Sequence, residues 1–470
     1  MPLIKIIRSG EELSVSFEGE KLLSDILIEN GYYIPHPCGG KGSCGKCLVT
    51  VNGKTVLSCR HVMTEDAVVI LPDSEELTAL GGGDGDGTAD NSESCLCLDI
   101  GTTTLALSLV SLKDKAVIRS VTAANPQRTF GADIISRIDY CTKHGTSAMQ
   151  TILVHSVKKM ISDLLGSDLS QVGKMYVAGN TTMLHIFFGV DPSSIGVSPY
   201  TPRFLDEKRC TGADIGISCV GEIVSLPGIS SFVGADILAG IAHVGLPDEG
   251  HYRILLDLGT NAEIALFSRD TILCTAAAAG PCFEGANISC GMSASEGAVY
   301  AVEADGGCSI IGDGEPRGLC ATGLIDAIAK GVRDGEIDES GYMEEDEMHI
   351  CGSANLVPRD VREFQLAKSA IRAATECLIR RAGIDFSAVE GLYVAGGFSA
   401  SLNVENAVFL GLIPDELSEC FHGINNSSLM GTVKRACYGR EVLPSLDSAV
   451  YVDLSADSAF SELFMEYMEF

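Results

Sequence analysis

Four cysteines near the N-terminus have types and spacing that suit metal binding: Cys38, Cys44, Cys47 and Cys59. Glycines at 39, 40, 42 and 45 lie among the first three, and they let the chain bend tightly because glycine takes positive φ freely. Thiolates that converge from such a loop can bind iron, and loop N–H groups directed at the sulfides would offset the charge of a cluster. The spacing therefore predicts an iron–sulfur cluster with these four ligands.

The cysteine gaps are close to those of plant-type ferredoxins, which have C-x4-C-x2-C and a distant fourth cysteine. Here the first gap has one more residue, as in vertebrate-type ferredoxins, and the fourth cysteine follows after only eleven. The segment 1–72 resembles a short [2Fe–2S] ferredoxin domain. A zinc ribbon and a set of free thiols are the alternatives. Zinc ribbons usually pair two C-x2-C knuckles, whereas only Cys44 and Cys47 form one here.

The elements expected around this loop fit a β-grasp domain. Apolar alternation predicts a hairpin over 3–7 and 13–17, a helix over 21–30, and short strands in 47–51, 55–59 and 67–71. This order, ββα followed by short strands, is the one that a β-grasp ferredoxin needs.

Composition places the whole chain among globular proteins of two or three domains. It has 470 residues, of which 46% are hydrophobic and 20% charged. Its 18 cysteines are scattered through apolar segments with no signal peptide before them, which favours free thiols and a cytoplasmic location. No apolar run reaches membrane-spanning length. The net charge of −30 argues against nucleic acid, whose phosphates need a basic stripe.

The clearest domain boundary is LTALGGGDGDGTADNSES, residues 77–94. The segment is rich in Gly, Asp and Ser and buries too little apolar surface to order itself. We therefore expect a domain at 1–76, a flexible linker at 77–94 and a second region at 95–470, with freedom for the first domain to move.

Two strand-turn-strand patterns after the linker could bind nucleotide. CLCLDIGTTTLALSLV (95–110) and ILLDLGTNAEIALFS (254–268) each run from an apolar strand through D-x-G-T into a second strand. Glycine lets the turn approach a phosphate, Thr hydroxyls and N–H groups can bind it, and the Asp can hold Mg²⁺ through water. A third strand, GLYVAGGFSASLNVENA (391–407), ends in two glycines at the head of an expected helix, and MYVAGNTTMLHIF (175–187) ends in a Gly-Asn-Thr-Thr turn.

A single D-x-G-T turn is weak evidence, but this ordered set resembles the sugar kinase, heat-shock chaperone and actin superfamily. The resemblance implies two RNase H-like lobes that close on ATP. It assigns the first phosphate loop to Asp99, Gly101, Thr102 and Thr103, the second to Asp257, Gly259, Thr260 and Asn261, and the adenosine contact to Gly396 and Gly397. Glu263 lies on the same strand face as Asn261, so it either positions the attacking water or pairs with a neighbour. Neither a Walker A loop nor a G-x-G-x-x-G motif is evident.

Further stretches resemble the reductive activators of corrinoid proteins, which join a [2Fe–2S] domain to an ATPase of this fold. They include NPQRTFGADIISRI (125–138), FVGADILAGI (232–241), GPCFEGANISCGM (280–292), ATGLIDAIA (321–329) and NNSSLMGTVKRA (425–436). Long members of that family carry an extra domain between ferredoxin and ATPase. Here only the linker fills that place, so we expect a short form without the middle domain.

The resemblance implies one reaction. The cluster would give one electron to a Co(II) corrinoid of a methyltransferase system and form Co(I), after a low-potential donor has reduced the cluster. A plant-type cluster sits at roughly −400 mV, so the transfer is uphill. Binding of ATP must favour one state of the partner over another, for example by changing the axial ligand of cobalt. A homodimer is a further expectation.

Three residues are candidates for the cobalt site and for catalysis. Ser289, in the glycine-punctuated loop 280–292, could supply an oxygen to cobalt, with Cys290 as a sulfur competitor; the alternative is a loop that only packs the lobe. Asp133 and Asp236 follow Gly-Ala at expected helix starts. Each could bind Mg²⁺ or orient water, or could simply interact with the helix dipole.

Three other functions compete with corrinoid activation. An activator of a radical dehydratase or of a benzoyl-CoA-type reductase uses the same ATPase fold, but usually holds a [4Fe–4S] cluster shared across a dimer. A small-molecule kinase with a redox-sensing appendage would turn over ATP with a hydroxyl or carboxylate acceptor. A nucleotide-dependent scaffold or chaperone would bind ATP without electron transfer.

Overall fold

A computed structural model describes residues 1–8, 11–30, 32, 34, 42, 47–72, 93–166, 172–259, 261–397, 399–455 and 457–470. Cys38, Cys44, Thr260 and most of the expected linker, residues 77–92, lie outside this set. The chain divides into two compact units, Met1–Asp236 and Ile237–Phe470. The expected β-grasp domain lies in the first of them.

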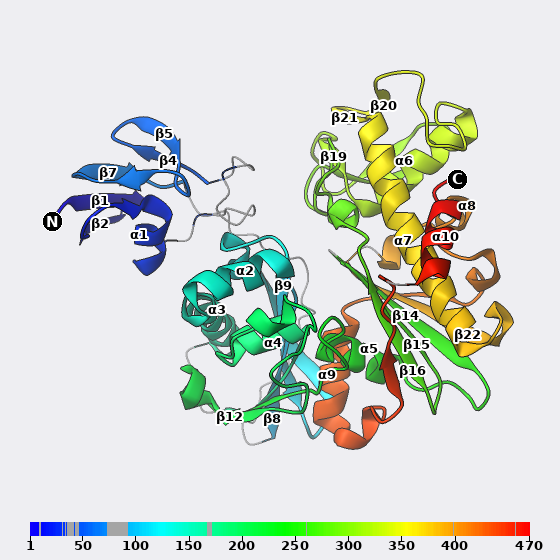
Figure 1. Ribbon diagram of the computed structural model, residues 1–470, viewed down its shortest axis with the longest axis horizontal. Helices are drawn as coiled ribbons and strands as arrows, with labels where there is room; N and C mark the ends of the chain where they lie inside the picture. Colours follow the sequence, from blue (N-terminus) through cyan, green and yellow to red (C-terminus); the bar gives the residue numbers. More distant parts are fainter. Residues whose placement is uncertain are drawn as a thin grey trace. The chain divides into compact units, whose positions relative to one another are not determined.

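The N-terminal domain is a five-stranded sheet in the order β2-β1-β7-β4-β5, with helix α1 beside it (Figure 1). β1 pairs antiparallel with β2 and parallel with β7. These pairings confirm the β-grasp prediction, although residues 21–22 form a short strand rather than the start of the helix. The elements are β1 (Leu3–Arg8), β2 (Glu11–Ser16), β3 (Lys21–Leu22), α1 (Leu23–Glu29), β4 (Leu48–Val51), β5 (Lys54–Leu57), β6 (Val62–Met63) and β7 (Ala67–Ile70).

This domain has a hydrophobic core of its own. Period-two alternation buries Ile4 and Ile6 on β1 and Val69 on β7, while the neighbouring Val68 and Ile70 stay exposed. The buried strand residues pack with apolar residues of α1 and with two of the predicted ligands, Cys47 and Cys59. These two predicted ligands are therefore anchored to the core of the domain.

A second sheet follows in the first unit, in the order β10-β9-β8-β11-β13-β12. β8, β9 and β10 are antiparallel neighbours, and β11 and β13 run parallel to β8. The elements are β8 (Ser94–Ile100), β9 (Thr104–Ser111), β10 (Ala116–Ala124), α2 (Ile134–His144), α3 (Ser147–Leu165), β11 (Val172–Gly179), α4 (Thr181–Phe187), β12 (Arg209–Thr211) and β13 (Val220–Ser225).

The second unit has its own six-stranded sheet, β23-β22-β14-β15-β16-β24, with the long helix α7 and the C-terminal helix α10 side by side (Figure 1). The sheet strands are β14 (Tyr252–Leu258), β15 (Ala262–Phe267), β16 (Ile272–Ala277), β22 (Val389–Ala395), β23 (Phe421–Ile424) and β24 (Ala449–Tyr451). The helices are α5 (Ala235–Val244), which begins at the unit boundary, α6 (Ala321–Asp334), α7 (Pro358–Ala382), α8 (Val404–Phe409), α9 (Ser427–Tyr438) and α10 (Ser458–Glu466). Shorter strands are β17 (Ala298–Val302), β18 (Cys308–Ile310), β19 (Gly318–Leu319), β20 (Met348–Cys351) and β21 (Ala354–Leu356).

The two six-stranded sheets repeat one topology. If five strands of each are numbered along the chain, both sheets read 3-2-1-4-5, with strands 1 to 3 antiparallel and strands 4 and 5 parallel to strand 1. This is the RNase H-like arrangement, and it confirms the predicted fold of both lobes. The turn β8–β9 thus corresponds to the turn β14–β15, and the end of β11 to the end of β22. Within the described part of the chain, no helix is long and apolar enough to cross a membrane.

Candidate functional site

The described half of the cysteine site fits a metal cluster. Cys47 precedes β4 and Cys59 follows β5, and these two strands pair antiparallel, which brings the cysteines together. Their sulfur atoms lie 3.3 Å apart, and both residues are buried. Neither cysteine is in a disulfide, and two buried sulfurs at this separation can reach one metal ion. Cys38 and Cys44 lie outside the described residues, so their part in the site stays a prediction.

The first phosphate turn connects β8 to β9 and has room only for glycine at one position. The N–H of Gly101 donates to the carbonyl of Thr104 at 3.0 Å and closes the turn. A Cβ on Gly101 would lie 2.7 Å from that carbonyl oxygen, a distance that real side chains do not adopt. Asp99 is buried at the end of β8, while Thr103 is exposed. The turn therefore presents backbone and hydroxyl groups, as phosphate binding requires.

Three buried side chains that sequence reasoning did not single out brace this turn. The side-chain amide of Asn125 donates to the carbonyl of Gly101 at 2.8 Å. Arg137, fully buried on α2, donates from Nη2 to the carbonyl of Thr102 at 2.7 Å. Asn180, the N-cap of α4, donates to Oγ1 of Thr102 at 3.1 Å. All three lie in stretches that the sequence analysis quoted for other reasons. Asn125 and Arg137 lie in 125–138, and Asn180 lies in the Gly-Asn-Thr-Thr turn of 175–187.

The second turn, β14–β15, places two carboxylates opposite each other. The N–H of Gly259 donates to the carbonyl of Asn261 at 3.0 Å, which tightens the turn. Asp257 and Glu263 are cross-strand partners in the β14–β15 register, and both are partly buried. Two carboxylates at one end of neighbouring strands suit a hydrated cation such as Mg²⁺. Thr260 lies outside the described residues.

The predicted adenosine turn lies next to the second phosphate turn. β22 runs parallel to β14 with Ala395 paired to Asp257, so Gly396 follows at the same edge of the sheet. A Cβ on Gly396 would lie 2.9 Å from the carbonyl oxygen of Leu258, and its φ of +127° also favours glycine. A Cβ on Gly397, in contrast, would have no atom of a described residue within 4 Å. A short 3₁₀ turn, Ser399–Ser401, follows instead of the expected helix, which begins only at Val404.

The two aspartates that follow Gly-Ala both stand at helix starts, as predicted. Asp133 is the N-cap of α2: its carboxylate accepts from the N–H of Ser136 at 2.7 Å in a capping box. Asp236 lies in the first turn of α5. The capping contacts give Asp133 a local structural role and favour the helix-terminus alternative for this residue. A role of either residue in Mg²⁺ binding or water orientation stays a prediction.

The loop 280–292 is tied to the start of α7 through Ser289. The N–H and hydroxyl of Ser289 donate to the same carboxylate oxygen of Asp360, at 2.7 and 3.0 Å. Asp360 is fully buried and also accepts from the N–H of Val357 at 3.2 Å, which caps α7. Burial, with the charge of Asp360 beside it, raises the pKa of the Cys290 thiol. Ser289 itself is exposed. Its hydroxyl therefore contacts the buried Asp360 and is also accessible from outside.

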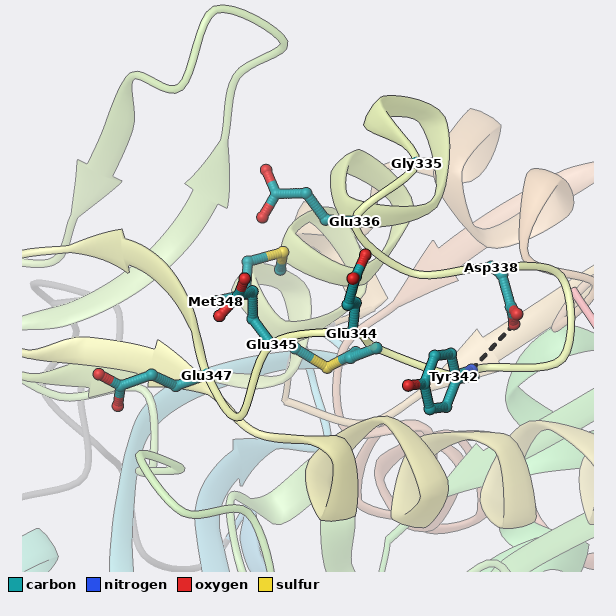
Figure 2. Close-up of a pocket in the computed structure, with 9 residues that line it drawn as sticks. Gly335, Glu336, Asp338, Tyr342, Glu344, Glu345, Glu347 and Met348 are labelled. Carbon is teal, nitrogen blue, oxygen red and sulfur yellow. Dashed lines mark hydrogen bonds between the residues drawn. The ribbon is translucent and has the colours of Figure 1, made fainter.

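An acidic pocket in the second unit is distinct from these turns. It has a volume of about 420 Å³, and glutamates and Asp338 surround it (Figure 2). The carboxylate of Asp338 accepts from the N–H of Tyr342 at 2.9 Å and holds the loop before β20. None of the predicted site residues lines the pocket, and its negative charge would repel phosphate.

The fold and the turns together define the class of protein: a ferredoxin-like domain joined to an ATPase of the actin and sugar kinase type. Three family models match adjoining parts of the chain. They are the 2Fe-2S iron-sulfur cluster binding domain at residues 6–71, the RACo middle region at 94–249, and the C-terminal domain of RACo, the ASKHA domain, at 251–470. Two RACo models thus match adjoining segments, and over most of its length the chain is similar to the RACo family.

Relatives and a solved structure agree with this assignment. The corrinoid activation enzyme RamQ of Eubacterium limosum is 26% identical over an alignment that covers 97% of each chain. The [Co(II) methylated amine-specific corrinoid protein] reductase of Methanosarcina barkeri is 26% identical over 67% of this chain and 65% of its own. A solved reductive activator for corrinoid, iron–sulfur protein is 25% identical, with a TM-score of 0.71 over 99% of this chain and 98% of that one.

One expectation is wrong. The sequence suggested a short form without the middle domain, whereas the RACo middle region matches residues 94–249. That segment contains the complete first six-stranded sheet, which we expected from the sequence to be one lobe of the ATPase. The error lay in the search for a separate domain between linker and ATPase: the matched middle region is the segment with the first RNase H-like sheet, which directly follows the linker.

Proposed function

We propose that this chain restores Co(I) in a corrinoid protein, by one-electron transfer from its [2Fe–2S] cluster at the expense of ATP. One observation carries the proposal: a cysteine site in a ferredoxin-like domain and two D-x-G-T turns in repeated lobes occur on one chain, in the domain order of the RACo family. The relatives named for corrinoid activation and Co(II) reduction support it. In the reaction, Co(II) gains one electron and the cluster loses one, which a low-potential donor then replaces.

The nucleotide chemistry is assigned to the turns. Gly101, Thr102 and Thr103 offer N–H and hydroxyl donors to phosphate, and Gly259, Thr260 and Asn261 do so in the second turn. Gly396 and Gly397 form the adenosine contact. Among the described residues no group of three or more metal-ligating side chains gathers, so Mg²⁺ is inferred from the carboxylates alone. Asp99 and Asp257 are each candidates to hold it through water, as are Asp133 and Asp236.

Glu263 is the residue that we propose to orient the attacking water. Its position opposite Asp257, at the end of two antiparallel strands, puts a carboxylate beside the proposed Mg²⁺. A carboxylate in hydrogen-bond reach of the water can take its proton as the bond to the γ-phosphate forms.

For the cobalt site we propose the loop around Ser289, because this residue is exposed and held in place by Asp360. Rotation about the Ser289 Cα–Cβ bond would exchange the contact with Asp360 for an oxygen contact to cobalt. The backbone N–H would keep the loop attached to Asp360 in both states. Cys290 is the weaker candidate, since burial raises its pKa and disfavours the thiolate.

The wider context is also a proposal. The partner would be the corrinoid protein of a methyltransferase system, reduced through a low-potential donor. The protein would act in the cytoplasm, where free thiols persist. The chain would assemble as a homodimer.

The decisive experiment is anaerobic. Purified protein, reduced and loaded with its cluster, is mixed with a Co(II) corrinoid protein with and without ATP, and the Co(I) absorption band is followed. We expect Co(I) only with ATP, and slower reduction with Ser289→Ala at unchanged ATP affinity. Absence of ATP-dependent Co(I) with any corrinoid partner would contradict the proposed function. An unchanged rate in Ser289→Ala would remove only that residue from the mechanism. An EPR spectrum of a [4Fe–4S] cluster would favour a dehydratase activator instead.

A further inference from the structure

The cysteine site contains a buried hydroxyl without a partner. Ser58 directly precedes Cys59, has no exposed surface, and its Oγ makes no hydrogen bond to any residue that the structure describes. Its backbone, in contrast, is fully used: the N–H donates to the carbonyl of Cys47 at 2.9 Å, and the carbonyl accepts from the N–H of Ser24 at 3.1 Å. Buried hydroxyls nearly always have a partner, so this one calls for an explanation.

The backbone contacts fix Ser58 between the two described ligands. Its N–H is hydrogen-bonded to the carbonyl of Cys47, and the next residue in the chain is Cys59. Those two sulfurs lie 3.3 Å apart within the same core. A donor that cannot leave this position and cannot reach water is suited to an acceptor that arrives with the metal, namely a sulfide or a cysteine thiolate.

We propose that the Ser58 hydroxyl donates a hydrogen bond to a sulfur atom of the cluster and thereby raises its reduction potential. The reduced cluster carries one more negative charge than the oxidised cluster, so a donor stabilises the reduced form more. The chain would then keep its cluster easy to reduce by the electron donor and leave the uphill step to ATP. The inference rests on the proposed cluster but not on cobalt chemistry, because it is tested without corrinoid protein and without ATP.

The test compares reduction potentials of the full-length, cluster-loaded protein. A dye-mediated titration followed by EPR is run on wild type, Ser58→Ala and Ser58→Thr. We expect Ser58→Ala to lower the reduced-to-oxidised ratio at a fixed potential by about three- to tenfold, which is about 30–60 mV for a one-electron couple. Ser58→Thr keeps the hydroxyl and should stay close to wild type.

The matched control is Ser24→Ala. Ser24 is also buried in this domain, but its hydroxyl has a partner on its own helix, the carboxylate of Asp25 at 3.4 Å. This variant should leave the potential unchanged. An equal shift in both alanine variants would mean that loosened packing, and not a contact with the cluster, sets the potential.

A second measurement reports on contact rather than stability. Pulsed EPR of the reduced protein in D₂O should detect one fewer strongly coupled exchangeable deuteron in Ser58→Ala than in wild type. If Ser58→Ala changes neither the reduction potential nor the deuteron count, the proposal is overturned, because the hydroxyl then makes no contact with the cluster. Failure of Ser58→Ala to assemble any cluster would also overturn it, since Ser58 would then serve assembly rather than tuning.

Discussion

At the scale of single residues, buried side chains brace the first proposed phosphate turn, β8–β9. Arg137 supplies a guanidinium to two backbone carbonyls, those of Thr102 and Gly131, from a position with no solvent exposure. Gly131 is buried and Thr102 partly buried, so the guanidinium supplies a donor where water has little access. Asn125 and Asn180 hold the same turn from two further elements. The phosphate-binding groups are therefore positioned before nucleotide arrives, which lowers the entropy cost of binding.

The residue-scale prediction concerns Glu263. Glu263→Gln keeps the size of the side chain and its place opposite Asp257, but it can no longer take a proton from water. We expect ATP hydrolysis to fall by roughly 10²- to 10⁴-fold while ATP affinity stays within a few fold. Steady-state phosphate release and calorimetric nucleotide binding measure the two quantities.

The matched control for this prediction is Glu390→Gln, which removes a carboxylate from β22 in the same lobe. Glu390 pairs with Arg253 at 2.7 Å and has no proposed part in catalysis. Its loss should leave hydrolysis unchanged. If Glu263→Gln also hydrolyses ATP at the normal rate, Glu263 only pairs with a neighbour.

At the scale of elements, α7 organises the second unit through buried polar side chains. Gln365 donates to the carbonyl of Met468 at 2.7 Å, and Ser369 donates to that of Tyr467 at 2.7 Å. Between them, Lys368 donates to the carbonyl of Glu469 and lies 4.9 Å from the ring centre of Phe470. These bonds fix the residues after α10 along α7, so the C-terminal segment is part of the packed lobe.

Lys368 makes this contact sensitive to pH. Burial, with Arg372 beside it, lowers the pKa of Lys368 from 10.5 to about 8. Between these two values the unfolded chain binds a proton that the folded chain does not, so the free energy of unfolding gains a contribution that rises with pH. Below pH 8 both states carry the proton and this contribution is constant. The full rise is on the order of 3 kcal/mol.

We therefore predict that Lys368→Met lacks this rise. Thermal unfolding of the variant and of wild type is compared at pH 7.5 and pH 10, and other titrating groups cancel in the double difference. From pH 7.5 to pH 10, the free energy of unfolding should rise more in wild type than in Lys368→Met. Lys434→Met, which removes another bond from an amine to a carbonyl, that of Ala242, is the control. Parallel pH profiles for wild type and Lys368→Met would contradict the prediction.

At the scale of the whole molecule, the ferredoxin-like domain and the C-terminal lobe have separate hydrophobic cores. Among the residues that the structure describes, the buried core of the ferredoxin-like domain extends from Ile4 to Leu71. The buried core of the C-terminal lobe extends from Ile254 to Leu463. Because neither core borrows side chains from the other, damage to one should leave the other folded.

The prediction at this scale uses Cys59→Ala in the full chain. The variant should lose the cluster and all Co(I) formation, since one ligand is gone. Nucleotide affinity should remain within about twofold of wild type, because the turns belong to other cores. Iron analysis, the Co(I) assay and calorimetric ATP binding report on the three properties. A large loss of ATP affinity would show that the cluster domain is needed to form the nucleotide site.

Local patterns in the sequence, with the family resemblance that they carry, were enough to predict the fold of this protein. Cysteine spacing, two D-x-G-T turns and apolar alternation are such patterns, and they predicted the β-grasp domain and both RNase H-like lobes. Other properties depend on partners that are distant in sequence, so they follow from the tertiary structure. Only strand pairing and side-chain contacts show that the two lobes repeat one topology, that Asp257 faces Glu263, and that Asn125, Arg137 and Asn180 brace one turn. Only burial shows that the hydroxyl of Ser58 lacks a partner among the described residues, because a sequence does not say which polar groups water can reach.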